Sequence, residues 1–158
     1  MTGPGPEIPA KLDLVVQNAT SFLPVPTQQQ FETWAKAALD ERGDAELLIR
    51  LVDRQESRQL NKQYAEKNKA TNVLSFPADL PAEIESALLG DLVICAQIVA
   101  DEAENQQKSV EAHWAHLTIH GVLHLLGFDH QVEEEANKME SLEIRILRSL
   151  GYPNPYHY

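Results

Sequence analysis

The sequence is poor in cysteine, in long apolar runs and in basic residues, and each shortage excludes a class of protein. Its 158 residues include one cysteine, Cys95, so neither an intrachain disulfide nor a zinc site made only of cysteines is possible. No stretch approaches the roughly 18 apolar residues that a membrane-spanning helix needs. The N-terminal run, MTGPGPEIPAKLDLVV, lacks the basic start and apolar stretch of a secretory signal. We therefore expect a cytoplasmic protein with no membrane partner.

Basic residues are outnumbered, because 13 Lys and Arg face 24 Asp and Glu, for a formal net charge of −11. That balance alone argues against binding to nucleic acid, which normally needs a basic surface. The basic residues are unevenly spread, however, and six of them lie within residues 50–69, opposed there by three acids. The six are Arg50, Arg54, Arg58, Lys62, Lys67 and Lys69. An acidic protein with one such basic segment can still bind a polyanion locally.

Length and hydrophobic pattern predict a single domain of the α+β (mixed α/β) class. We expect a flexible N-terminus over 1–10, one metal-dependent hydrolase domain over 11–152 and a C-terminal tail over 153–158. A single layer of about four strands should pack with about five helices. The predicted strands are 11–17, 45–53, 72–77 and 89–96. The predicted helices are 27–42, ended by Gly43, then 54–66, 97–107, 110–126 and 132–149.

Five of the six histidines fall in residues 113–130, HWAHLTIHGVLHLLGFDH. His120 and His124 are four residues apart, so both imidazoles lie on one helical face and can reach one ion. Gly127 allows the chain to turn back, and His130 can then supply a third nitrogen. Three protein ligands leave one position for water, the arrangement of a catalytic zinc. We therefore predict one zinc ion, used for hydrolysis, on helix 110–126 and the loop that follows.

Two other histidines of this run have a simpler interpretation. His113 and His116 are typical of helix packing and helix surface, because no returning loop is evident for them. His116 precedes His120 by four residues and is therefore the next candidate ligand.

The spacing His-x3-His-x2-Gly-x2-His also invites comparison with metzincin proteases. Those enzymes place a glutamate directly after the first histidine as general base, whereas this chain has Gly121 there. Losing such a base typically costs about 10²- to 10⁴-fold in rate. A zinc-dependent peptidase is therefore an alternative, but a disfavoured one.

The histidine run, HGVLHLLGFDH (120–130), resembles the HGxLHLxGxDH motif of the YbeY family of bacterial zinc-dependent endoribonucleases. The blocks TNVLSFP (71–77) and LGDLVIC (89–95) are similar to that family as well. The resemblance implies that His120, His124 and His130 bind zinc. It also implies a single-strand-specific endoribonuclease that acts on RNA rather than DNA. The expected role is maturation of the 3′ end of the small-subunit rRNA and ribosome biogenesis, with rRNA and ribosomal particles as partners.

One departure from the family concerns a basic residue near the expected site. The family commonly has an arginine after the tyrosine that precedes the TNVLSFP block, but Ala65 follows Tyr64 here. We predict that Arg58 takes the catalytic role, with Arg54 and Lys62 binding substrate from the same helical face. The competing interpretation of these three cations is a solvated helix face. The competing interpretation of the whole protein is a ribosome-assembly factor whose zinc is mainly structural. The sequence does not fix the oligomeric state.

Overall fold

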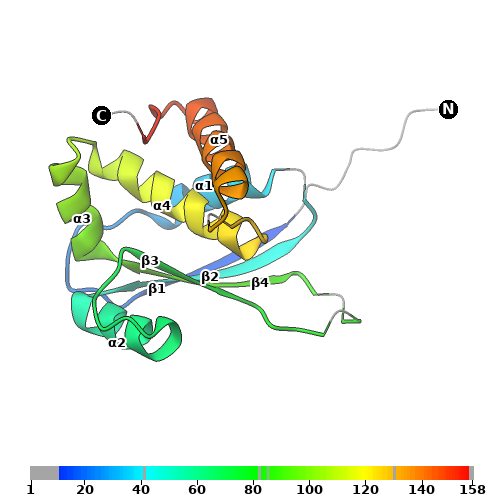
Figure 1. The fold of residues 1–158 in the computed structure, drawn as a ribbon, viewed down its shortest axis with the longest axis horizontal. Coiled ribbons are helices and arrows are strands. Elements are labelled where there is room, and N and C mark those ends of the chain that lie inside the picture. The colour runs from blue at the N-terminus through cyan, green and yellow to red at the C-terminus, as the bar shows by residue number, and fades with distance from the viewer. Residues whose placement is uncertain (1–10, 41, 82, 85, 130, 157–158) are drawn as a thin grey trace.

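The computed structural model describes residues 11–156 except 41, 82, 85 and 130 (Figure 1). Within these residues the chain forms five helices and one sheet of four strands, which confirms the α+β class. The strands are β1 (Leu12–Asn18), β2 (Ala45–Val52), β3 (Val73–Pro77) and β4 (Leu88–Cys95). The helices are α1 (Gln28–Leu39), α2 (Arg54–Ala65), α3 (Ala96–Asn105), α4 (Val110–Leu125) and α5 (Glu133–Ser149). The predicted flexible segment 1–10 lies outside the described residues.

The sheet is mixed, with strand order β1-β2-β4-β3. β1, β2 and β4 run parallel, in a register that pairs Leu14 with Leu47 and Ile49 with Leu92. β3 runs antiparallel to β4 at the edge of the sheet, pairing Leu74 with Val93. The TNVLSFP block therefore forms an edge strand, beside the strand that carries the LGDLVIC block.

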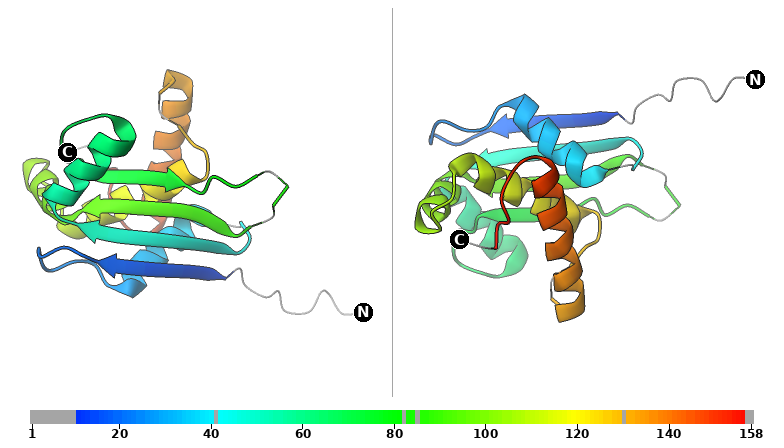
Figure 2. Two further views of the ribbon diagram at one scale, coloured as in Figure 1. Left: turned by 90° about the horizontal axis from the view of Figure 1, so that it is seen from below. Right: turned by 90° about the horizontal axis from the view of Figure 1, so that it is seen from above.

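Helices cover both faces of the sheet (Figures 1 and 2). α1, α4 and α5 lie over one face, and α2 lies on the other. The main core forms between the sheet and the first group, around fully buried Phe31, Ile49, Ile119 and Leu123. A smaller apolar cluster around Val52, Val93 and Cys95 lies apart from this core and includes Leu60 of α2. None of the helices in the described part of the chain combines the length and apolar character needed to cross a bilayer.

Helix α4 packs closely against the sheet at Gly121, a residue with no side chain. A Cβ added at Gly121 would lie 2.8 Å from Leu92 Cδ2 on β4, closer than carbon atoms pack. Position 121 therefore faces the sheet. A glutamate at position 121 would collide with Leu92, so this chain cannot carry the general base of metzincins there.

The helix boundaries match the sequence pattern with one exception. Thr27 caps α1 through a reciprocal capping box with Gln30, as its residue type indicates. The helix then ends at Leu39, rather than at about residue 42 as predicted from Gly43, because Asp40 has a positive φ of 52°. The residue type of Asp40 gives no clear signal for this conformation.

Candidate metal centre

His120 and His124 lie one turn apart on α4, and their side chains converge. Ser109 starts this helix by accepting a hydrogen bond from the main-chain N–H of Ala112. The Nε2 atoms of His120 and His124 lie 3.1 Å apart, with ring centroids 4.6 Å apart. Two nitrogens that each bind one zinc ion at about 2.0–2.1 Å stand a little over 3 Å from each other. The pair therefore fits a shared metal ion.

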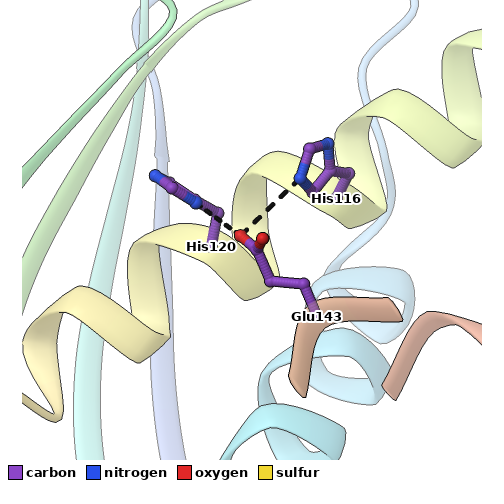
Figure 3. A group of neighbouring side chains, drawn as sticks. All are labelled: His116, His120 and Glu143. Carbon is purple, nitrogen blue, oxygen red and sulfur yellow. Dashed lines mark hydrogen bonds and ion pairs between the residues drawn. The ribbon is translucent and has the colours of Figure 1, made fainter. Parts of the chain in front are cut away.

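The opposite nitrogen of His120 is held by a buried carboxylate. His120 Nδ1–H donates a hydrogen bond to Glu143, which lies on α5 and is 0% exposed. Figure 3 shows this carboxylate reaching up from α5 to the rings of His116 and His120. A proton fixed on Nδ1 leaves the Nε2 lone pair for a metal, which is the usual arrangement of a histidine ligand supported by a carboxylate. Glu143 thus sets both the tautomer and the orientation of His120.

Glu143 also belongs to a second possible ligand set. One ligand atom from each of His116, His120 and Glu143 lies within 4.8 Å of the others, so this group could hold a metal ion. Burial raises the pKa of Glu143, but hydrogen bonds from His116 and His120 outweigh burial and bring it to about 2. Burial lowers the pKa of His116, and the hydrogen bond and negative charge of Glu143 offset only part of this lowering. Since a direct hydrogen bond already joins His120 to Glu143, we favour Nε2 of His120 as the metal-binding atom.

The converging nitrogens face a cleft of about 600 Å³, which Asn61 and Ala65 of α2 also line. His120 and His124 line it from α4, and Ser75 lines it from β3. Among the described residues that line the cleft, the basic side chains besides the histidines are Lys67 and Lys69. The remaining lining residues are Thr71, Asn72, Val73, Leu74, Pro77 and Gln131. The cleft therefore combines two histidines that can bind a metal ion with two lysines that can bind an anion.

Residues 67–71, which we name the rim loop, are held in place by two buried polar side chains of α2. The amide of Asn61, 3% exposed, donates to the main-chain oxygen of Lys69, and its own main-chain oxygen accepts from Lys67 N–H. The hydroxyl of Ser57 pairs with both main-chain groups of Thr71. Because these bonds use main-chain atoms of the loop, they fix its course without involving the lysine side chains.

The residues predicted from sequence are not all brought to this cleft. Arg58 and Lys62 line a separate hollow of about 270 Å³ on α2, where Arg58 Nε donates to Asn68 at 2.7 Å. Arg54 forms an ion pair with Asp101 on α3. Ala65, where the family commonly has an arginine, does line the histidine cleft. The catalytic and substrate-binding roles given to Arg58, Arg54 and Lys62 stay predictions, and His130 lies outside the described residues.

Two features of the site were not assigned from sequence. Glu143 was missed, although it shares the buried face of α5 with Met139, Ile146 and Leu147. An acid placed on an apolar face is a recognisable signal, because a buried carboxylate needs a partner. Lys67 and Lys69 were counted in the basic segment without a role, since nothing in the local pattern shows which basic residues share a cleft with the histidines.

A comparison with known protein families decides the class of the protein. Residues 15–151 match the family described as Endoribonuclease YbeY. The chain belongs to this family. Membership of the YbeY family makes it an enzyme of the hydrolase class with RNA as its substrate, and the resemblance inferred from the three sequence blocks is confirmed.

Similarity to a solved structure supports the fold separately. The chain is similar to the solution structure of TM1509 from Thermotoga maritima, with a TM-score of 0.52 and 21% sequence identity. The similarity covers 91% of this chain and 100% of that one. At this level of identity the match concerns the fold, which agrees with the family match over residues 15–151.

Proposed function

We propose that this YbeY-family protein is a single-strand-specific endoribonuclease that depends on one zinc ion bound by His120, His124 and His130. The observation that carries the metal part is the 3.1 Å separation of the two Nε2 atoms, with Glu143 behind His120. Two neutral imidazoles suit zinc, and the family motif supplies the third histidine. The RNA part rests on membership of the family.

The chain's own residues have distinct tasks in this proposal. When bound, zinc supplies Lewis-acid chemistry toward the phosphodiester. Glu143 holds the His120 ring in its metal-binding orientation. Lys67 and Lys69, which line the histidine cleft, bind phosphates of the RNA strand near the one being cut. The sequence-based roles of Arg58 in catalysis and of Arg54 and Lys62 in substrate binding are retained as proposals, with RNA extending from the cleft onto α2.

The biological substrate follows from the family resemblance. We propose that the enzyme trims the 3′ end of the small-subunit rRNA, acts on ribosomal particles during ribosome biogenesis and resides in the cytoplasm. The proposal of single-strand specificity rests on the same family resemblance.

One observation favours a second candidate, a ribosome-assembly factor whose zinc is mainly structural. Position 65 lines the histidine cleft and carries an alanine, so the cleft lacks the arginine common in the family. The peptidase alternative has no such support, since position 121 faces Leu92 and cannot present a general base to the cleft.

The proposal is tested by metal analysis and RNA cleavage on the same preparation. Protein purified without chelator should contain about one zinc ion per chain. It should cut a single-stranded RNA that spans the 3′ end of small-subunit rRNA, and should cut the same RNA annealed to a complementary strand much more slowly. Chelation should abolish cleavage, and added zinc should restore it. Tight binding to ribosomal particles without cleavage, with zinc supplied, would favour the assembly factor instead.

A further inference from the structure

The C-terminal tail returns to the helices that carry the candidate metal centre. After α5 the chain turns at Gly151, which has a φ of +90°. Figure 2 shows the tail running back across the layer formed by α4 and α5. Two tyrosines fix it there. The hydroxyl of Tyr152 donates to Glu111 and accepts from the indole N–H of Trp34, whereas Tyr156 lies further along, beside His116 and Glu143.

Tyr156 completes the set of groups around the buried carboxylate. Its hydroxyl donates a hydrogen bond to Oε2 of Glu143, and its oxygen lies 3.4 Å from His116 Nε2. The other carboxylate oxygen, Oε1, accepts from His120 and lies 3.6 Å from His116 Nε2. Each oxygen of Glu143 therefore has its own partner, and rotation of the carboxylate about its terminal bond would break both hydrogen bonds.

We propose that Tyr156 is a positioning residue of the metal centre, which it acts on through Glu143 and His120. This inference rests on the proposed metal site. A carboxylate that supports a histidine ligand keeps the ring oriented only if it is itself held in place. Within the described residues, Tyr156 binds the carboxylate oxygen that His120 does not use. The tail thus contributes to metal affinity although it supplies no ligand.

The obvious alternative is that Tyr156 only anchors the tail. The two tyrosines allow the roles to be separated, because each forms hydrogen bonds through its hydroxyl but only Tyr156 reaches Glu143. Tyr156→Phe removes the hydroxyl and keeps the ring that packs edge-on against His116, with centroids 5.4 Å apart. Tyr152→Phe is the matched control, since it removes hydrogen bonds to Trp34 and Glu111 outside the cleft.

The experiment measures zinc affinity by competition with a chromophoric chelator, using the full chain without RNA. Loss of a partner that orients a histidine ligand typically weakens metal binding about 10- to 100-fold. We expect Glu143→Gln to fall in that range. Tyr156→Phe, one step further from the ion, should weaken zinc binding about tenfold, and Tyr152→Phe should leave it unchanged. Thermal unfolding of the metal-free proteins shows whether both Phe variants remain folded.

A second readout follows the His120 ring directly. In metal-free protein, nitrogen-detected NMR of the imidazoles should show His120 protonated at Nδ1, and Tyr156→Phe should populate the other tautomer. Unchanged zinc affinity and tautomer in Tyr156→Phe, with zinc binding and RNA cleavage intact in the unsubstituted protein, would overturn this inference alone. Absence of zinc binding in the unsubstituted protein would overturn both the inference and the proposed metal dependence.

Discussion

Two basic regions lie on α2 and in the loop that follows it, and they differ in what they face. The rim loop presents Lys67 and Lys69 to the cleft that contains His120 and His124. The second region, which we name the α2 stripe, consists of Arg54, Arg58 and Lys62 and lies along the helix; two of these line a separate hollow. Both belong to one basic segment of the sequence, but only the rim loop shares a cavity with the histidines. Charge density along a chain therefore locates a polyanion-binding region only coarsely, and the fold decides which cations lie near the reacting group.

The largest expected effect comes from the histidines of the cleft. The rim loop and the α2 stripe can be compared as RNA-binding regions only if these histidines bind the metal. His124→Ala should abolish zinc binding and reduce RNA cleavage by at least about 100-fold, because two ligands hold a metal ion far less tightly than three. His113→Gln is the matched control on the same helix, since His113 pairs with Glu102 and does not line the cleft. Full cleavage by His124→Ala would refute the proposed metal centre.

The next largest effect should come from the rim loop. Replacing Lys67 and Lys69 together by alanine should lower kcat/KM for single-stranded RNA about tenfold, because two phosphate contacts are lost. The slope of log affinity against log salt should become shallower by about 1.4, at roughly 0.7 per contact with a single strand. Binding titrations at several salt concentrations provide the measurement. An unchanged slope would remove the rim loop from the RNA-binding surface.

A cation added to the histidine cleft tests the comparison of the two basic regions by a gain of activity. Ala65 is exposed and lines the cleft, so an arginine at this position has room to reach the phosphodiester. Ala65→Arg should raise kcat/KM about tenfold by adding a charge-assisted hydrogen bond near the developing negative charge. Ala65→Gln, which is polar and unbranched at Cβ but shorter and uncharged, should change it little. If both variants behave alike, size rather than charge matters at this position.

The smallest effect is expected for the α2 stripe. Arg58→Ala should lower kcat/KM only about two- to fivefold, because Arg58 lines a hollow separate from the cleft and is bonded to Asn68. Arg54→Ala should have less effect still, since its guanidinium is paired with Asp101. Steady-state kinetics on one RNA substrate separates kcat from KM. A fall in kcat for Arg58→Ala would establish the catalytic role predicted from the sequence.

Most of the fold could be predicted because local pattern and tertiary structure agree in this chain. The alternation of apolar residues and the caps at Thr27 and Ser109 place the helices and strands within a few residues of their observed bounds. The end of α1 was wrong because it depends on a positive φ at Asp40, which residue type signals only weakly. The strand order, with β3 at the edge beside β4, has no local signal at all.

The candidate site was predictable where its residues are close in sequence. The spacing of His120 and His124 specifies one helical face, and the structure brings their rings together. Glu143 and Tyr156 are separated from His120 by 23 and 36 positions, so their contacts follow from the packing of α5 and the tail against α4. Periodicity likewise placed Arg54, Arg58 and Lys62 on one stripe, but it could not show that Arg58 and Lys62 line a hollow separate from the histidine cleft.

The way in which α2 holds the rim loop has a consequence for how such an enzyme can diversify. Ser57 and Asn61 grip peptide groups, which every amino acid possesses, and they leave the side chains at positions 67 and 69 unconstrained by that grip. The side chains at positions 67 and 69 can therefore change without loss of the hydrogen bonds that hold the main chain of the loop. Exchanging those two lysines can change how tightly the enzyme holds the RNA backbone, while the main chain of the loop keeps its course.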